Sequence, residues 1–251
     1  MARLDIEGVT AGFDGMTVIE DVNLTVPDGA VACLLGPSGC GKTTLFHVVA
    51  GLERPASGRV LLDGRDVTGQ PGQLAYMLQK DLLLAHKTIL DNVALPLVLQ
   101  GVRTSEARRR ARELFDVFGL AGTEQRWPSE LSGGMRQRAA LARSYLFNGD
   151  FMLLDEPFSA LDAFTKADMH EWFLGVAQRT GTTALMVTHD IDEAVEIADE
   201  VFVMRGNPQA GRPTRIVGSE RIDDCPREAR AGFNLTDAFL VHKRRLLELL
   251  G

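Results

Sequence analysis

Short, almost entirely apolar runs recur along the chain, at Val31–Leu35, Arg59–Leu62, Phe151–Leu154, Thr183–Thr188 and Val201–Met204. Strands that are covered on both faces have this composition, because neither face meets water. Segments with apolar side chains at helical spacing lie between several of them: Lys42–Gly51, Phe164–Gln178 before Gly181, and Asp190–Ala198, where Asp190 and Glu193 are spaced like a capping box. This alternation predicts an α/β core with a mainly parallel sheet flanked by helices.

The middle of the chain has a different pattern. From about residue 88 to residue 148 the pattern is helical, with little strand character. The segment Ser105–Phe118 is rich in arginine and places Ala107, Ala111, Leu114 and Phe115 on one helical face. An all-helical insertion in the α/β core is the simplest interpretation, and its arginines lie either on a solvated face or against anionic lipid headgroups. A final amphipathic helix is expected over about Thr236–Leu250.

Composition narrows the class of protein. The chain has 251 residues, of which 45% are apolar and 24% charged, which are ordinary values for a globular protein. Its net charge of −7 argues against a nucleic-acid-binding protein. The three cysteines, Cys33, Cys40 and Cys225, form no CxxC pair, which argues against a disulfide framework or a zinc site and fits a reducing cytoplasm.

No segment has the sequence of a membrane anchor. The N-terminus lacks an apolar signal-peptide core, and no apolar run approaches the roughly 20 residues that span a bilayer. The longest candidate, Val93–Leu99, is short and contains Pro96. If the chain serves transport, we therefore expect other subunits to supply the channel.

The strongest motif follows the first buried run and matches the phosphate-binding pattern G-x-x-x-x-G-K-[ST]. Its residues are Gly36, Pro37, Ser38, Gly39, Cys40, Gly41, Lys42, Thr43 and Thr44. The glycines let backbone N–H groups surround phosphate oxygens, and the helix that follows directs its positive end at the same anion. Lys42 would reach the β- and γ-phosphates, and the Thr43 hydroxyl would ligate Mg²⁺. A chance glycine-rich turn is the alternative, but the strand before and the helix after favour a phosphate loop.

Cys40 lies inside this loop. A small residue suits a tight turn, which is sufficient reason for a cysteine there. The backbone amides and Lys42 could also lower the pKa of its thiol. That second interpretation predicts that alkylation of Cys40 blocks nucleotide binding.

Acidic side chains end the strand Phe151–Leu154. Asp155 is placed to hold Mg²⁺ through water, and Glu156 could act as the general base that polarises the attacking water. His189 follows the strand Thr183–Thr188, at the edge where parallel sheets bind ligands. A lone histidine is more often structural, yet this position favours a contact with the γ-phosphate.

A second anion site is expected where Leu131-Ser-Gly-Gly-Met-Arg-Gln-Arg138 opens a helix. Ser132 is a good N-cap, and Gly133 and Gly134 leave backbone amides bare. Because the phosphate loop already surrounds the phosphates, this surface would complete the site of a second copy, unless it is an ordinary capped helix.

These motifs, in this order, resemble the ATP-binding subunits of ABC transporters over nearly the whole chain. The resemblance identifies Phe13 as the aromatic residue that stacks on adenine and Gln79 as the glutamine that senses the γ-phosphate and Mg²⁺. It identifies Leu131–Met135 as the signature motif, with Met135 where the broad family prefers glutamine. It also assigns Ser159–Asp162 to the D-loop and His189 to the switch histidine.

The resemblance implies a fold with three parts in one ATPase domain, residues 1–251. A P-loop core (residues 4–87 and 149–220) would include an N-terminal antiparallel β subdomain. Residues 88–148 would form the helical subdomain that carries the signature, and residues 221–251 a short helical tail. This tail is too short for the β-rich regulatory domain of sugar-importer relatives.

The resemblance also implies partners. Two ATPase chains, as a homodimer or an ATPase–ATPase pair, would enclose two ATP molecules, each held between one chain's phosphate loop and the other's Ser132, Gly133, Gly134 and Met135, with Asp162 nearby. ATP and Mg²⁺ are the implied cofactors. The dimer would dock on two transmembrane permease subunits at the cytoplasmic face of the inner membrane. An extracytoplasmic substrate-binding protein would complete the complex, and no nucleic acid is expected.

Four stretches are more particular: Tyr76–Leu84, Asp91–Leu97, Leu131–Arg138 and Glu156–Asp162. Together they resemble importers of the nitrate, sulfonate and taurine type, including those for pyrimidine precursors. Ala85-His86 departs from the Pro-Trp common in that group, in a segment expected to face the permease.

Two other classes of protein remain as alternatives to an importer subunit. A soluble ABC-type mechanical ATPase usually has long coiled-coil insertions or fused ATPase domains, and a phosphotransferase would leave Leu131–Arg138 unexplained.

Overall fold

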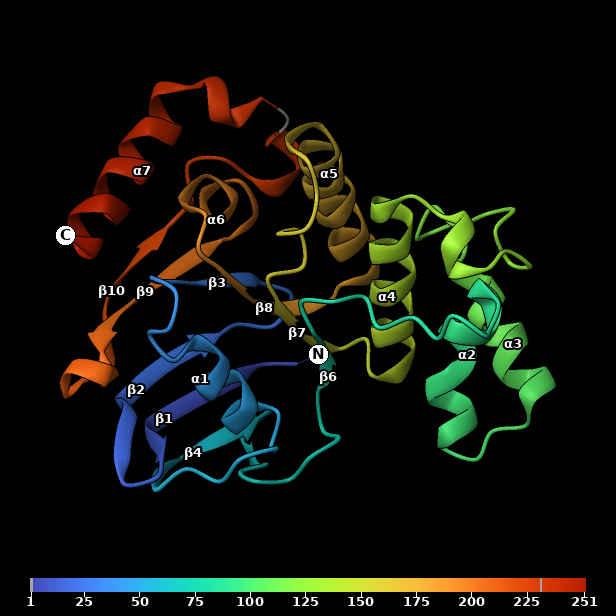
Figure 1. Ribbon diagram of the computed structural model, residues 1–251. Helices are drawn as coiled ribbons and strands as arrows, with labels where there is room; N and C mark the ends of the chain where they lie inside the picture. Colours follow the sequence, from blue (N-terminus) through green and yellow to red (C-terminus); the bar gives the residue numbers. More distant parts are fainter. Residues whose placement is uncertain (1, 231) are drawn as a thin grey trace.

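A single ten-stranded sheet organises the protein, in the strand order β5-β4-β1-β2-β10-β9-β3-β8-β7-β6 (Figure 1). The structure is a computed structural model that describes residues 2–230 and 232–251. The strands are β1 (Leu4–Phe13), β2 (Met16–Val26), β3 (Val31–Leu35), β4 (Ser57–Leu62), β5 (Arg65–Asp66), β6 (Ala75–Met77), β7 (Phe151–Asp155), β8 (Thr183–Thr188), β9 (Glu200–Asn207) and β10 (Arg212–Arg221). The helices are α1 (Lys42–Val49), α2 (Ile89–Leu99), α3 (Thr104–Glu113), α4 (Gly133–Phe147), α5 (Ala163–Thr180), α6 (Ile191–Ile197) and α7 (Asp237–Leu250), with short 3₁₀ turns η1 (Pro128–Glu130), η2 (Pro208–Ala210), η3 (Arg227–Ala229) and η4 (Phe233–Leu235).

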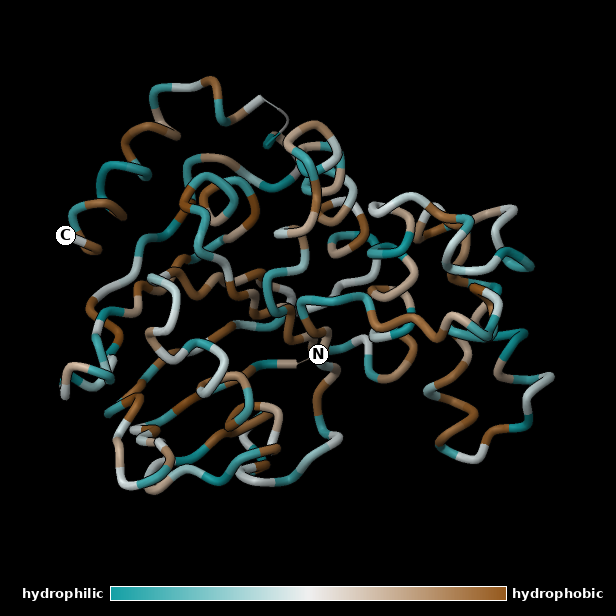
Figure 2. The backbone as a smooth tube through the Cα atoms, in the orientation of Figure 1, coloured by the Kyte–Doolittle hydropathy of each residue, from teal (hydrophilic) through white to brown (hydrophobic). Residues whose placement is uncertain are grey.

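Four of the five apolar runs lie in the parallel half of the sheet, β9-β3-β8-β7-β6. The expectation of a strand covered on both faces was wrong for the fifth, Arg59–Leu62, which belongs to β4, pairs antiparallel with β1 and β5, and has only Val60 buried. The predicted bounds of β3 and β8 are confirmed, and every residue of both strands is buried. Alternate residues of β3 enter two different cores. Cys33 faces α5 and α6, whereas Leu34 faces α1, so both faces of this half are covered. Figure 2 shows the apolar stretches that run along these strands.

The other half of the sheet is antiparallel. β1 pairs with β2 and β4, and β10 pairs antiparallel with β9 and parallel with β2, so it joins the two halves. Periodicity alone did not locate β1, β2 or β10. Repeated register shifts break the alternation of β1, and β10 is polar, with half-buried and exposed positions mostly in turn and only Thr214 buried. The sheet is therefore mixed, with its parallel pairing concentrated beside the phosphate loop.

Residues 88–148 fold as α2, α3, η1 and α4, beside the β6 edge of the sheet (Figure 1). α3 ends at Glu113, five residues before the predicted end, because the next turn tightens so that Phe115 and Phe118 become buried. Its arginines are largely engaged on the surface: Arg108 pairs with Asp91 at 2.6 Å, and two others pair with Glu106. The arginine-rich face is thus internally neutralised.

The remaining helices agree in type with the sequence pattern. α5 ends at Gly181 in the left-handed conformation, as predicted. Asp190 caps α6 by accepting hydrogen bonds from the N–H groups of Asp192 and Glu193. The Glu193 carboxylate does not complete a capping box, because it pairs with Lys166 of α5 at 2.6 Å. Within the described residues, no helix combines the length and apolar character needed to cross a membrane.

Candidate functional site

The phosphate loop lies between β3 and α1, and two of its glycines pack closely against neighbouring strands. A Cβ atom on Gly36 would lie 2.7 Å from the carbonyl oxygen of Met204, in β9. Gly41 has φ 103°, and a Cβ atom there would lie 2.7 Å from a methyl group of Val18, in β2. Glycine is required at both positions, for packing at Gly36 and for packing and conformation at Gly41.

Lys42 folds back over this loop and is buried. Its ammonium donates to the carbonyl oxygens of Gly36, at 2.7 Å, and Pro37, at 3.0 Å. The Thr43 side chain, in contrast, is exposed and lines the adjoining cavity. The loop therefore presents a fixed positive charge and a free hydroxyl at one opening.

Of the two interpretations of Cys40, a small residue in a tight turn or a thiol with a lowered pKa, the structure contradicts the second. Cys40 is 2% exposed, and this burial raises the pKa of its thiol more than Lys42 and the backbone N–H groups lower it. The thiol also packs close to Gly36, 3.0 Å from the position a Cβ atom would take there. Cys40 therefore serves as a small apolar residue inside the turn.

Asp155 ends β7 directly beside the loop. Burial raises the pKa of its carboxyl group, and a hydrogen bond from the Tyr76 hydroxyl, at 3.3 Å, acts in the opposite direction. Tyr76 is held by edge-to-face contacts with Phe46 and His47. Its own pKa is raised strongly, by burial and by Asp155, so the phenol stays a proton donor. Sequence reasoning placed Asp155 but not its tyrosine partner.

Glu156 lies at the centre of the predicted catalytic group. Its Oε1 atom is 3.1 Å from Nδ1 of His189, and its Oε2 atom accepts a 3.4 Å hydrogen bond from the Gln79 amide. The same amide donates to the Ser159 hydroxyl at 3.2 Å. The backbone of Glu156 is left-handed, with φ 45°, and its N–H donates to the carbonyl of Val187 in β8. Two residues far apart in the sequence, Gln79 and His189, thus converge on one carboxylate.

A cavity of about 290 Å³ unites the phosphate loop with the acidic strand end. Phe13 lines it and is 54% exposed, an unusual state for an aromatic ring and suited to a stacking surface. Sequence reasoning did not include five further lining residues: Met16, Val18, Val187, Pro208 and Gln209. The sequence shows a turn around Pro208. Because this turn is far from the phosphate loop in the chain, the sequence gives no sign that the two lie at the same cavity.

The signature residues lie elsewhere. Ser132 caps α4 by accepting from the Met135 N–H at 3.3 Å, and Asp162 caps α5 by accepting from the N–H and hydroxyl of Thr165. The two caps are neighbours, because Gly134 packs against Thr165. None of Ser132, Gly133, Gly134, Met135 and Asp162 lines the phosphate-loop cavity within the described chain. Phe164, just after Asp162, is 89% exposed.

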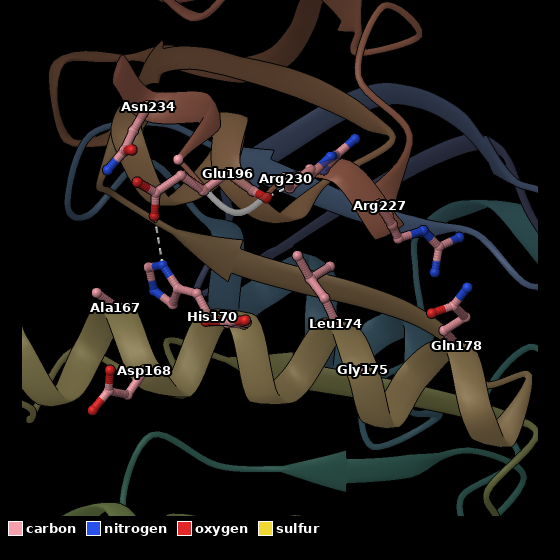
Figure 3. A pocket seen from close by; sticks show the side chains of 12 residues that line it. Ala167, Asp168, His170, Leu174, Gly175, Gln178, Glu196, Arg227, Arg230 and Asn234 are labelled. Atoms are coloured by element: carbon pink, nitrogen blue, oxygen red, sulfur yellow. Dashed lines mark hydrogen bonds and ion pairs between the residues drawn. The ribbon is translucent and has the colours of Figure 1, made fainter. Parts of the chain in front are cut away.

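A second cavity, of about 390 Å³, lies between α5, Glu196 of α6 and four residues of the C-terminal segment, Arg227, Arg230, Gly232 and Asn234 (Figure 3). Four of its charged or titratable groups, His170, Glu196, Arg227 and Arg230, have internal partners. His170 contacts Glu196 at 2.7 Å, and Arg230 donates to the backbone carbonyls of Cys225, Ile222, Glu196 and Ala198. None of the predicted site residues lines it. This region fastens the C-terminal segment to the core.

The fold and the site together define an ATP-binding-cassette core. The sequence pattern of the ABC transporter family matches residues 19–159, and the chain belongs to this family. It is similar to the Fe(3+) ions import ATP-binding protein FbpC of Brucella abortus, with 44% identity over 82% of this chain and 60% of the relative. It is also 42% identical to the ABC transporter ATP-binding protein YtlC of Bacillus subtilis, over 92% of this chain and 90% of that protein.

Two further comparisons extend this result. The sulfate/thiosulfate import ATP-binding protein CysA of Synechococcus elongatus is 40% identical over 85% of this chain and 63% of that protein. The chain thus spans about three-fifths of the FbpC and CysA relatives. Among solved structures it is similar to the dimeric bacterial ABC transporter cassette MJ0796, with a TM-score of 0.70 and 26% identity over 87% of this chain and 98% of the other.

Proposed function

We propose that the chain is the ATP-binding and ATP-hydrolysing subunit of an ABC importer. The observation that carries this proposal is the convergence of Gln79 and His189 on the carboxylate of Glu156, which lines the same cavity as the phosphate loop. Backbone amides of residues 36–41 and the Lys42 ammonium would bind the phosphates of ATP. Phe13 would stack on the base at the other end of the cavity.

The residues present fit Mg²⁺. The Thr43 hydroxyl, the Asp155 carboxylate and the Gln79 amide offer oxygen atoms, which are the ligands that Mg²⁺ prefers. Bound there, the ion would neutralise phosphate charge. Tyr76 orients Asp155, so the carboxylate is held in one direction before any ligand arrives.

Glu156 is proposed as the general base. Its carboxylate can accept a proton from the water that attacks the γ-phosphate. Its two oxygens are steadied from opposite sides by His189 and Gln79, and its backbone is fixed by Val187. His189, with a half-exposed side chain, can then contact the γ-phosphate while it positions Glu156. This geometry supports a base with two orienting groups beside the reacting centre.

A second ATPase chain would complete the site. Ser132, Gly133, Gly134 and Met135 lie outside the cavity, so within one chain they would not reach the nucleotide that it binds. The related cassette MJ0796 forms dimers, including one bound to ADP and Pi. We propose a head-to-tail dimer in which these residues and Asp162 meet the partner's nucleotide. The exposed Phe164 ring would be covered in that dimer.

Permease subunits are proposed to dock beside β6. An apolar groove of about 580 Å³ lies there, lined by Tyr76, Leu95, Pro96, Leu99 and Phe147 among others. Leu99 is 78% exposed. Tyr76 of this groove begins the segment Tyr76–Leu84, whose continuation at Ala85-His86 the family resemblance directs toward the membrane subunit. The chain would thus act peripherally at the cytoplasmic face of the inner membrane, with a substrate-binding protein on the opposite side.

The cargo is proposed to be a small anion, of the nitrate, sulfonate, taurine or pyrimidine-precursor kind. Two relatives carry the names of sulfate/thiosulfate and Fe(3+) import proteins, which supports import but not one substrate. The same names make a soluble mechanical ATPase the less favoured function. Identifying the ligand of the co-purified binding protein would test this assignment; a peptide or sugar would contradict it.

Glu156→Gln tests the proposed chemistry. The variant keeps the hydrogen-bonding shape but removes the base, so we expect ATP binding to persist and hydrolysis to fall by at least about 100-fold. The trapped nucleotide should also shift the chain toward a dimer in size-exclusion chromatography. Glu171→Gln, an exposed position on α5, is the matched control and should hydrolyse ATP normally. Normal turnover by Glu156→Gln would refute the base assignment, and failure of the unmodified chain to bind ATP would refute the function.

A further inference from the structure

The base end of the phosphate-loop cavity is formed by the tips of two hairpins. The β1–β2 tip carries Phe13 and Met16, which pair with each other across the turn. β10 runs parallel to β2, and Thr214 pairs with Ile19, so the start of β10 lies beside the start of β2. The β9–β10 tip therefore lies next to the β1–β2 tip, as Figure 1 shows. Pro208 and Gln209 of the β9–β10 tip line the same cavity as Phe13.

The β9–β10 tip is a fixed turn. The Asn207 side chain accepts from the Ala210 N–H at 3.2 Å, Pro208 is buried, and Gly211 closes the turn in the left-handed conformation with φ 69°. Below the turn, Gly206 packs so closely on Thr214 that a Cβ atom would lie 2.4 Å from its backbone. Gln209 is thus presented at a defined place, while its own side chain is exposed.

Gln209 is polar, whereas the hairpin residues around it in the cavity are apolar. The hairpin residues that line the cavity are Phe13, Met16, Val18, Pro208 and Gln209, and of these only Gln209 is polar. All charged lining groups belong to the phosphate end, with Lys42, Asp155 and Glu156. In residues 2–230 and 232–251 the Gln209 amide makes no hydrogen bond. A polar group with unused donors and acceptors therefore stands at the rim of an otherwise apolar base site.

We propose that Gln209 recognises the edge of the nucleobase and makes the site prefer ATP to GTP. A glutamine amide offers one acceptor beside one donor group. Adenine presents the complementary pair, its N6 amino group and its N7 atom, whereas guanine presents two acceptors, O6 and N7. The amide can satisfy both positions of adenine but only one kind of position on guanine. This inference rests on the proposed nucleotide-binding function and adds the choice of base.

The test compares the affinities of the non-hydrolysable β,γ-imido analogues of ATP and GTP by titration calorimetry. In Gln209→Leu, which keeps the size but loses the amide, we expect the preference for the ATP analogue to fall by about five- to tenfold, the lower end for a bidentate contact because the residue is exposed. In Gln209→Lys, which can only donate, the preference should move further toward the GTP analogue. Phe13→Ala should weaken both analogues alike.

Gln125→Leu, at an exposed glutamine between α3 and η1, is the matched control and should keep the unmodified preference. An unchanged ratio in both Gln209 variants would overturn the inference and leave the proposed function intact. If the unmodified chain bound neither analogue, the proposed function itself would fail, so the two failures are distinguishable.

Discussion

Replacing Arg143 with alanine should loosen the segment that follows Gln79. The Arg143 guanidinium, on α4, donates to the backbone carbonyls of Asp81 at 2.6 Å and Leu82 at 2.9 Å. Leu82 has a left-handed backbone, with φ 44°, which a leucine adopts only when its surroundings hold it. A second arginine of α4, Arg136, pairs with the Asp81 carboxylate at 3.2 Å. The helix α4, which begins within the signature motif, thus holds the segment that follows Gln79 in place.

The size of the effect follows from these contacts. A hydrogen bond from a charged donor contributes about 1.5–3 kcal/mol, so two contribute roughly 3–6 kcal/mol, and the lower end applies because the contacts are at most partly buried. Freeing the arginine side chain returns about 1–2 kcal/mol of rotamer entropy. We therefore expect the free energy of unfolding to fall by about 2 kcal/mol, which lowers the Tm by roughly 4–8 °C in a chain of this size. Because the segment positions Gln79, kcat for ATP should also fall, by about tenfold, with little change in KM.

Thermal unfolding by circular dichroism and steady-state ATP hydrolysis measure the two effects. Arg112→Ala removes an exposed arginine of α3 that has no partner in the described chain, and it should change stability by less than about 0.5 kcal/mol. Arg143→Lys should fall between the two, because a lysine has one ammonium with which to reach two carbonyls. A Tm and a kcat for Arg143→Ala equal to those of Arg112→Ala would refute the reasoning.

Two further predictions concern residues that sequence reasoning did not single out as functional. Tyr76→Phe removes the hydrogen bond to Asp155; we expect the Mg²⁺ concentration for half-maximal hydrolysis to rise about fivefold, for a loss of about 1 kcal/mol, and an unchanged Mg²⁺ titration would contradict it. Burial alone would lower the pKa of His170, but Glu193 and Glu196 outweigh it and raise the pKa above its ordinary value. Charged His170 therefore stabilises the fold below about pH 6.5, and this stabilisation is lost as pH rises through the raised pKa. Denaturant titrations of the unmodified chain and His170→Gln should differ more at about pH 6 than at about pH 9, and a difference that grew with pH would contradict the assignment.

The local sequence pattern was sufficient to predict those elements whose residues all have the same environment. β3 and β8 are buried on both faces, so a continuous apolar run marks each of them, and the residues of the phosphate loop form a single contiguous motif. Elements that depend on distant partners were harder. β10 is polar, and its pairing with β9 and β2 explains why it joins the sheet.

In the candidate site, too, some features could be predicted from local sequence and others depend on distant parts of the chain. Glu156, Gln79 and His189 were expected to share one site and do lie together, although their catalytic roles stay predictions. Gln209 reaches the cavity only because β10 lies beside β2. The raised pKa of Cys40 depends on how tightly neighbouring segments pack on it, which no local motif records. Long-range packing is what the sequence pattern leaves out.

The glycines of the phosphate loop bear on the thermodynamics of binding. Gly36 abuts β9 and Gly41 abuts β2, whereas Gly39, with φ 77°, has open space around the position of a Cβ atom. The two ends of the loop are therefore clamped between the halves of one sheet, and only its middle has steric freedom. Most of the loop's conformational entropy is already lost when the chain folds. An incoming triphosphate would meet a preorganised set of amide dipoles, so the entropic cost of binding would fall mainly on the nucleotide.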